Sequence, residues 1–315
     1  MNTVTTPASD EVFAHPALFY RSEREYTDCS VSFVRQGLEA GEPVAVAVPA
    51  PNLELIRAGL GTEARDVVFL DMTEAGRNPG RIIPGVLRAF ADEHAGARVR
   101  IIGEPVWAGR SAAEYPACAQ HEALINAAFT GRPATILCPY DESRLHADVL
   151  ADARRTHPTV IADGREAASG SYDWPAVVAR YDEPLTAPPD AASFAFGAEE
   201  LPDARRFAVA RARSLGLPER RLPDLELAVA ELTTNSVVHG GGRGTLAVWA
   251  EAGQTVCEVR DAGRLTDPLA GRRPPERGQI GGRGLLLVHY VSDLVRTHTA
   301  EDGTAVRFHL GGPLA

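Results

Sequence analysis

The segment from residue 231 to residue 239 places three polar side chains, Glu231, Asn235 and His239, at intervals of four residues. Because an α-helix turns by about 100° per residue, these side chains would lie within roughly 80° of one another around the helix axis. A complementary apolar stripe is formed by Leu225, Ala228, Val229 and Leu232. The pattern predicts a helix with a buried face and a row of acid and amide side chains beside it, ended by the glycines from 240 to 242. Taken alone, it is also typical of an ordinary amphipathic helix whose polar row is only solvated.

A second pattern with chemical potential is the glycine cluster at 281–284, which stands directly before an apolar helical stretch at 285–290. Glycines at the start of a helix leave backbone amides exposed, and the helix N-terminus favours an anion, for which phosphate is the natural candidate. Upstream, a predicted strand at 256–261 ends in Asp261-Ala262-Gly263. The loop that follows, 264–279, contains three prolines and four arginines. We expect this loop to be too polar to pack in a core and to act as a mobile lid.

The charge composition excludes several classes of protein. All 32 basic residues are arginine, and the 42 acidic residues bring the net charge to −10. The absence of lysine removes the phosphate-binding lysine of a Walker A loop, any Schiff-base lysine and the strand lysine of eukaryotic-type protein kinases. The negative net charge argues against direct binding of nucleic acid, because its phosphate backbone binds surfaces with clustered positive charge.

The elements that would position these residues fall into two regions, as a length of 315 residues favours two domains. In the first region, apolar segments alternate with helical ones, which predicts a mostly parallel sheet with helices on both faces. The predicted strands are 15–20, 43–48, 67–71, 99–103, 135–138 and 159–161. The predicted helices are 23–39, 53–60, 81–94, 114–129 and 144–155.

A segment rich in Gly, Ser, Asp and Pro, 167–192, is predicted to be a linker with one short helix near 174–181. We therefore expect one domain at 1–166 and another at 193–315. In the second domain the predicted strands are 193–196, 245–250, 256–261, 293–298 and 304–310. Helices are predicted at 199–215, around Glu231 and at 285–290. The chain as a whole is thus expected to be an α/β protein.

In a parallel sheet, ligands bind beyond the carboxyl ends of the strands. Four residues just past the predicted strands of the first domain are candidates for contact with a sensed ligand: Tyr20, Glu104, Trp107 and Tyr140. Each could equally be a cap or turn residue. Cys118 and His121 lie three residues apart beside Glu122, but no second pair is spaced to complete a metal site.

The sequence also bears on the compartment of the protein. No run approaches 18 apolar residues and no basic segment precedes an apolar one at the N-terminus, so neither a membrane span nor a signal peptide is expected. The four cysteines are scattered without a Cys-x-x-Cys pair, which is typical of reduced thiols. We expect a cytoplasmic protein without a membrane partner.

The first region resembles a known family in four short motifs. These are Gly41-Glu42-Pro43, Gly103-Glu104-Pro105-Val106-Trp107, Cys138-Pro139-Tyr140-Asp141 and His157-Pro158-Thr159-Val160-Ile161. In this order they resemble the MEDS domain, a sensory domain named after methanogen and methylotroph regulators, over roughly residues 11–165. The resemblance implies a RecA-like α/β core that senses a small-molecule ligand or another signal.

The second region resembles the Bergerat-type ATPases, also called the GHKL superfamily or HATPase_c domains, over about residues 190–313. The motifs, in order, are Glu231 and Asn235 with His239, then Asp261-Ala262-Gly263, then Gly282-Arg283-Gly284-Leu285. This superfamily includes gyrase, histidine kinases and the bacterial anti-sigma serine kinases. The resemblance implies an α/β sandwich with a mixed sheet, helices on one face, and ATP and Mg²⁺ as cofactors.

The resemblance also implies a role for each matching residue. Asn235 would bind the Mg²⁺ ion that bridges the phosphates, and Glu231 would be the general base. Asp261 would accept a hydrogen bond from the adenine amino group, while Gly263 would permit the base to approach closely. The other positions expected to contact the nucleotide are His239, Gly282, Arg283, Gly284 and Leu285. Among these, Arg283 would be a charge partner in place of the missing lysine.

One departure from the superfamily distinguishes its branches. The Asp261 motif continues with Arg264 and Leu265, where histidine kinases commonly have a further glycine. The shorter motif and the form Glu-Leu-x-x-Asn-Ser-Val-x-His-Gly favour the anti-sigma branch. A phosphoacceptor histidine is also missing, because no histidine occurs between His157 and His239.

The leading functional expectation is therefore a sensor-linked anti-sigma factor with serine/threonine kinase activity. It would bind a sigma factor in one state and phosphorylate a STAS-type anti-anti-sigma antagonist in another, and by analogy it could be a homodimer. One alternative is a non-catalytic binding switch in which ATP only orders the lid and the partner surface. Another is a standalone ATP hydrolase. The signal at the first domain is expected to act on partner binding through the linker.

Overall fold

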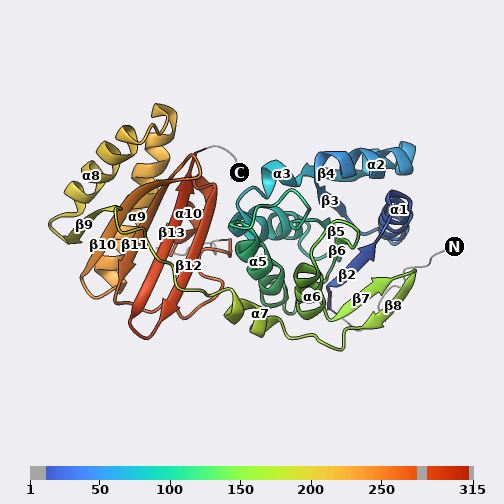
Figure 1. Ribbon diagram of the computed structural model, residues 1–315. Helices are drawn as coiled ribbons and strands as arrows, with labels where there is room; N and C mark the ends of the chain where they lie inside the picture. Colours follow the sequence, from blue (N-terminus) through green and yellow to red (C-terminus); the bar gives the residue numbers. More distant parts are fainter. Residues whose placement is uncertain (1–11, 275–281, 312–315) are drawn as a thin grey trace. The chain divides into compact units, whose positions relative to one another are not determined.

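The computed structural model describes residues 12–274 and 282–311. The chain divides into two compact units, with the boundary between Tyr181 and Asp182 (Figure 1). Within the described residues, no helix combines the length and the apolar character that a membrane crossing requires.

The first unit is built on an eight-stranded sheet in the order β4-β3-β5-β6-β2-β7-β8, with β1 also paired to β6. Its strands are β1 (Phe13–Ala14), β2 (Pro16–Tyr20), β3 (Val44–Val48), β4 (Val67–Asp71), β5 (Val99–Gly103), β6 (Ala134–Asp141), β7 (Thr159–Ala162) and β8 (Arg165–Ala168). All pairs are parallel except the β7–β8 hairpin. Central strands such as β3, Val-Ala-Val-Ala-Val, are buried along their whole length, because helices cover both faces.

Helices α1 (Glu23–Glu39) and α2 (Ala50–Leu60) cover one face of this sheet, where they bury side chains from β2, β3 and β6 (Figure 1). Helix α5 (Tyr115–Ala128) lies on the other face and packs against α6 (Ala147–Thr156) and α7 (Trp174–Arg180). Shorter helical segments are 3₁₀ turns at Gly61–Asp66 and Pro79–Arg81, α3 (Met72–Ala75) and α4 (Arg88–Glu93). The mostly parallel α/β sheet predicted for this region is confirmed.

The sequence prediction differs from the structure at three places in the first unit. The predicted helix 81–94 is interrupted by a π-helical stretch, Ile83–Leu87, before α4 begins. Pro84 lies in that stretch and has no N–H to donate, which disrupts regular α-helical bonding. Strands β1 and β8 were not predicted, because one has two residues and the other is exposed throughout.

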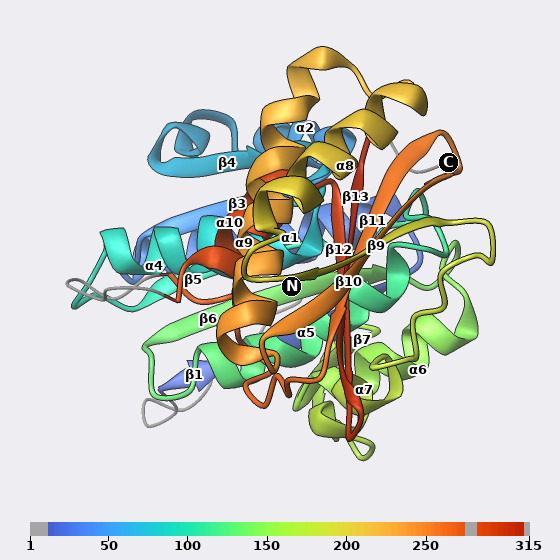
Figure 2. The ribbon, with the colours of Figure 1, turned by 90° about the vertical axis from the view of Figure 1, so that its left-hand side faces the viewer.

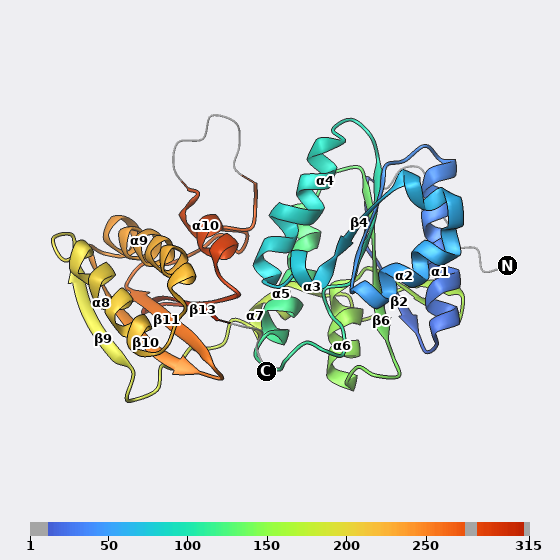
Figure 3. The same cartoon turned by 90° about the horizontal axis from the view of Figure 1, so that it is seen from above.

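The second unit has a five-stranded sheet in the order β12-β13-β11-β10-β9. Its strands are β9 (Ala192–Gly197), β10 (Arg243–Glu251), β11 (Gln254–Asp261), β12 (Leu294–Ala300) and β13 (Gly303–Leu310). Its helices are α8 (Leu201–Ser214), a 3₁₀ turn at Glu219–Arg221, α9 (Leu222–His239) and α10 (Gly284–Val291). The three α-helices lie on one face of the sheet, as expected (Figure 3), and α8 and α9 pack side by side (Figure 2).

The sheet of the second unit is antiparallel, whereas a mixed sheet was predicted. Every pair between its described strands is antiparallel. Two of these pairs, β10–β11 and β12–β13, are hairpins with tight turns, while β11–β13 and β9–β10 join segments that are distant in the chain and also run antiparallel.

Both faces of this antiparallel sheet are covered. Along β10, Leu246 and Val248 point to the helices, while Ala247 and Trp249 point to the opposite face. There the segment of the second unit that precedes β9 packs against them through Ala187 and Ala191. At its start, the Asp182 carboxylate accepts a hydrogen bond of 3.1 Å from the backbone N–H of Thr299. Part of the segment predicted as a linker is thus built into the second unit.

Candidate functional site

Helix α9 supplies the central row of the site. It buries the apolar stripe that its sequence pattern predicts and leaves Glu231 and Asn235 partly exposed beside it. The hydroxyl of Thr233 donates to the carbonyl of Val229, so this buried polar group is satisfied within the helix.

The end of β11 brings Asp261 against this helix. One carboxylate oxygen accepts a hydrogen bond of 2.6 Å from the Ser236 hydroxyl, and the other accepts one of 2.8 Å from the Gly263 N–H. These two bonds fix the orientation of the carboxylate. A Cβ atom on Gly263 would lie 2.6 Å from the His239 carbonyl oxygen, so only glycine fits at this approach.

The start of α10 lies on the other side of the polar row. A Cβ atom on Gly284 would be 2.6 Å from Glu231 Oε2 and 3.2 Å from Asn235 Nδ2. Gly282 has a φ of +73°, a left-handed conformation that favours glycine, and Arg283 precedes the first turn with an exposed side chain. The first amides of α10, which have no partner within a helix, therefore lie close to the acid and amide of α9. Gly281, the first glycine of the predicted cluster, lies outside the described residues.

These groups surround a cavity of about 490 Å³. Of the predicted nucleotide-contact residues, its lining includes Asn235, His239, Asp261, Gly263, Gly282, Gly284 and Leu285. Leu232, Val259 and Val306 add apolar wall. Glu231 and Arg283 do not line it, although Glu231 lies next to Gly284, which does. The structure thus gathers residues from α9, β11 and α10 that lie far apart in the sequence.

Three residues of this site were missed by the sequence analysis. Ser236 orients Asp261, Gly240 lines the cavity at the end of α9, and Thr304 donates a hydrogen bond of 2.8 Å to the Gly263 carbonyl. Ser236 and Gly240 were within the motif already quoted, so their positions carried a signal. No sequence pattern pointed to Thr304, because only the pairing of β11 with β13 brings it near Gly263.

The loop after Gly263 is packed where it is described. Leu269 is 2% exposed and Arg272 is 7% exposed. The prediction that this loop is too polar to pack is therefore wrong for its described part. The Leu265 N–H donates to the hydroxyls of Thr299 and Thr304. The later part of the predicted lid, 275–279, lies outside the described residues.

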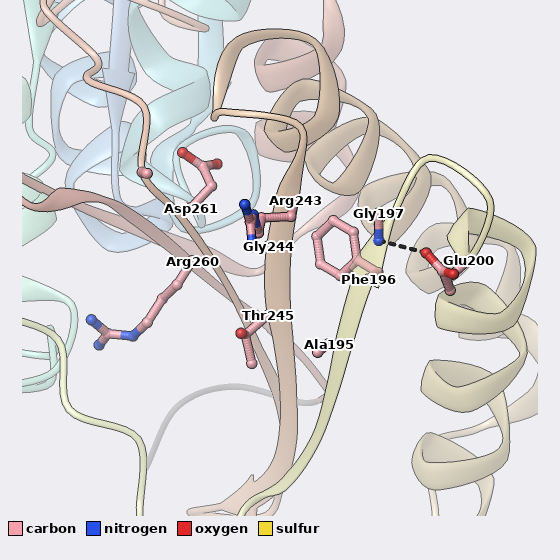
Figure 4. Close-up of a pocket in the computed structure, with 10 residues that line it drawn as sticks. Ala195, Phe196, Gly197, Glu200, Arg243, Gly244, Thr245, Arg260 and Asp261 are labelled. Atoms are coloured by element: carbon pink, nitrogen blue, oxygen red, sulfur yellow. Dashed lines mark hydrogen bonds between the residues drawn. The ribbon is translucent and has the colours of Figure 1, made fainter.

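A second cavity, of about 570 Å³, lies beside β9, β10 and the end of β11. Figure 4 shows Phe196, Arg243 and Asp261 among the side chains around it. The Gly197 N–H donates a hydrogen bond of 2.9 Å to Glu200 at its far end. Asp261 lines both cavities and so stands between them.

In the first unit, two of the four sensory candidates belong to one polar group. Glu104 is buried, accepts a hydrogen bond of 3.2 Å from the Tyr26 hydroxyl and accepts two from the Asn52 amide, the shorter 2.8 Å. The ring of Tyr20 packs against that of Tyr26. Burial raises the pKa of Glu104 to about 8, against the effect of these hydrogen bonds. Burial, followed by the nearby Glu104 and Asp141, also raises the pKa of Tyr20.

The other two candidates lie elsewhere. The ring of Trp107 is covered by the guanidinium of Arg110, at 4.0 Å from its centroid. Tyr140 donates a hydrogen bond of 3.0 Å to Glu122 on α5. The four residues predicted to meet a single ligand therefore divide among three environments.

Comparison with known families follows the same division of the chain. Residues 14–158 match the model of the methanogen/methylotroph DcmR sensory domain, MEDS. Residues 194–310 match the model of the histidine kinase-like ATPase domain. The chain joins a MEDS sensory domain to a histidine kinase-like ATPase domain. A search of curated proteins found no match.

The chemistry of the cavity in the ATPase domain is suited to a nucleotide. Its volume is within the range of ordinary small-molecule sites. It combines apolar wall, a fixed carboxylate, an amide side chain and the start of a helix. At four of its glycines, Gly240, Gly263, Gly271 and Gly284, an added Cβ atom would collide with a neighbouring atom. These features match the needs of a base, a hard cation and an anionic phosphate chain.

Proposed function

We propose that the protein is a sensor-linked anti-sigma factor. Its ATPase domain binds ATP with Mg²⁺, sequesters a sigma factor and phosphorylates a serine or threonine of a STAS-type anti-anti-sigma antagonist. The observation that carries the proposal is the convergence of Asn235, Asp261 and the start of α10 on one cavity, with Glu231 directly beside it. The family match of this domain supports nucleotide binding.

Three residues hold the nucleotide in this proposal. Asp261 keeps lone pairs for the adenine amino group, because Ser236 and Gly263 use only one hydrogen bond on each of its oxygens. Asn235 offers a neutral amide oxygen to Mg²⁺, whose role is to neutralise charge on the phosphates. Arg283 supplies positive charge next to the exposed amides of α10, since the chain has no lysine for that position.

Glu231 is the residue on which kinase activity depends. As general base it removes the proton from the attacking hydroxyl of the antagonist, and a carboxylate within hydrogen-bond reach can do this. Its contact with Gly284 supports a place near the phosphate end of the cavity.

A second function is favoured by one specific observation. Glu231 does not line the cavity and packs against the first residue of α10 instead. In a non-catalytic switch, the nucleotide would change only the conformation of the loop before α10 and the partner surface. A standalone ATP hydrolase is the third reading, and rapid turnover of ATP without a partner would favour it.

The test compares Glu231→Gln and Asn235→Ala in the full chain, with the exposed neighbour Thr234→Ala as control. Calorimetry with a non-hydrolysable ATP analogue and Mg²⁺ measures binding, and transfer of labelled phosphate to a co-purified STAS-type protein measures kinase activity. We expect Asn235→Ala to lose Mg²⁺-dependent binding. Glu231→Gln should keep binding and lose transfer by about 10²–10⁴-fold, the usual contribution of a general base.

The possible results separate the three readings. Transfer by Glu231→Gln at the rate of the unsubstituted chain would refute its role as base. Nucleotide-dependent partner binding without any transfer by the unsubstituted chain would establish the switch instead of the kinase. Binding unaffected by Asn235→Ala would remove the assigned cation ligand.

A further inference from the structure

Four buried side chains from separate elements of the first unit converge at one point. They are His15, just before β2, Glu122 on α5, Cys138 on β6 and His157, just before β7. Each is at most 2% exposed. One potential ligand atom from each lies within 4.8 Å of the others. None of these side chains has a role in the function proposed above.

The hydrogen bonds of His157 direct one ring nitrogen into the cluster. Its Nδ1 lies 2.8 Å from the Ala153 carbonyl oxygen, which can only accept, so Nδ1 carries the proton. The other nitrogen, Nε2, lies 3.1 Å from Glu122 Oε2. In a neutral ring, its lone pair therefore faces a carboxylate.

His15 is oriented in the same way by Asn126. The Asn126 amide nitrogen donates to the carbonyls of Ala123 and Thr156, so its oxygen faces His15 Nδ1 at 3.3 Å. His15 Nε2 then points to Cys138 Sγ at 3.4 Å and to Glu122 Oε2 at 3.8 Å. Fixing the outer nitrogen of each ring by a second residue is how proteins present histidine to a metal.

Two buried atoms of these four side chains lack a hydrogen bond. Among the described residues, neither Glu122 Oε1 nor His157 Nε2 has a hydrogen-bond partner, although both are buried. Tyr140 donates to Glu122 Oε2, the oxygen that faces His15 and His157, while Oε1 lies 4.0 Å from His121 Nε2. An electron-rich group of two imidazoles, a carboxylate and a sulfur atom, closed to solvent, favours a cation.

We propose that the MEDS domain binds one first-row divalent cation, with Zn²⁺ as the best fit, through His15, Glu122, Cys138 and His157. Zinc accepts nitrogen, sulfur and oxygen ligands together, in tetrahedral sites at bond lengths of about 2.0–2.3 Å. Such bonds place neighbouring ligand atoms roughly 3.3–3.8 Å apart. The separations of 3.1, 3.4 and 3.8 Å between atoms of the cluster are close to this range. Because all four positions come from the protein, the site is of the closed, structural kind.

The competing arrangement is a buried ion pair, in which a protonated His157 bonds to Glu122 and Cys138 stays a thiol. It has no need of a metal. The two arrangements differ in metal content and in the state of the sulfur atom, and both can be measured on the full chain.

The experiment begins with the full chain purified without chelators, whose metal content is measured by mass spectrometry. The chain is then stripped with a chelator and titrated with Co²⁺. We expect one equivalent of metal per chain, tetrahedral Co²⁺ bands, and a thiolate-to-cobalt charge-transfer band in the near ultraviolet. Cys138→Ser should lose that charge-transfer band. Cys29→Ser, a buried cysteine of the same unit outside the cluster, should keep it.

A stripped chain that remains folded by circular dichroism and binds neither Co²⁺ nor Zn²⁺ would overturn the proposal in favour of the ion pair. If stripping unfolds the chain, recovery of the fold on adding Zn²⁺ would support the site. Failure to recover together with no metal in the purified chain would refute it. A charge-transfer band that persists in Cys138→Ser would refute the assignment of the sulfur ligand.

Discussion

Asp261 illustrates how one carboxylate is prepared for recognition. Its two oxygens are held by a hydroxyl from α9 and by an amide two residues further along the chain. Removing the hydroxyl would free the carboxylate to rotate, although Ser236 is not among the residues expected to contact the nucleotide. The orientation of a recognition group therefore depends on Ser236, which does not itself need to contact the ligand.

Glu104 allows a prediction at the same scale. Its pKa rises from 4.5 in the unfolded chain to about 8, chiefly through burial, so the folded state holds this proton more tightly. Its stabilising contribution is complete below pH of about 4.5 and is lost as the pH rises towards about 8. Relative to Glu104→Gln, which mimics the protonated acid, the unsubstituted chain should lose up to a few kcal/mol of stability over this range.

Chemical denaturation of both chains at several pH values measures this difference. The free energy of unfolding of the unsubstituted chain should fall with pH more steeply than that of Glu104→Gln. Parallel pH profiles would show that Glu104 is ionised in the folded protein across the range.

At the scale of elements, the site depends on close packing between the ends of α9, β11 and α10. Gly263→Ala would place a methyl group 2.6 Å from the His239 carbonyl oxygen. We expect it to destabilise the ATPase domain by about 1–3 kcal/mol, the usual cost of overpacking. Because the shift also displaces Asp261, affinity for an ATP analogue should fall at least about tenfold, which corresponds to 1.4 kcal/mol.

Calorimetric binding and thermal unfolding of the full chain measure both effects. Gly170→Ala is the control, since nothing lies within 4 Å of its added methyl group. Equal affinity and equal stability of Gly263→Ala and the unsubstituted chain would show that the junction between α9 and β11 tolerates a side chain.

At the scale of the whole molecule, the second unit starts earlier than its first strand. Asp182 binds the backbone of Thr299, and Ala187 and Ala191 cover the outer face of Trp249. A fragment 182–315 should therefore be more stable than a fragment 193–315 by about 1–3 kcal/mol, through one charge-assisted hydrogen bond and the covered apolar area.

Urea denaturation of the two fragments, with Asp182→Ala in the longer one, measures this difference. Asp182→Ala should account for part of the difference in stability between the two fragments. Identical unfolding midpoints would show that the segment before β9 contributes nothing. The same boundary matters for testing sensory control, because a deletion ending at residue 188 would remove Asp182 and Ala187 from the ATPase domain.

Much of the fold could be read from local patterns. Alternating apolar strands and helices predicted the parallel sheet of the first unit, and apolar segments joined by turns predicted the strands of the second. The elements α1 and β4 have the predicted bounds. The interruption of helix 81–94 could not be located, because Pro84 is compatible with either a kink or an early helix position. The strand directions of the second sheet were also beyond local patterns, since pairing joins segments distant in the chain.

The sequence by itself determined the chemical inventory: the acid and amide row of α9, the motif ending at Gly263, the glycines before α10 and the absence of lysine. Only the tertiary structure decided that most of these residues line one cavity, that Glu231 lies next to Gly284 without lining it, and that Ser236 and Thr304 support the cavity. It also united His15, Glu122, Cys138 and His157, which no spacing rule could connect. The reason is that strand pairing and helix packing bring together residues that are many positions apart, whereas sequence periodicity reports only on neighbours within a single helix or strand.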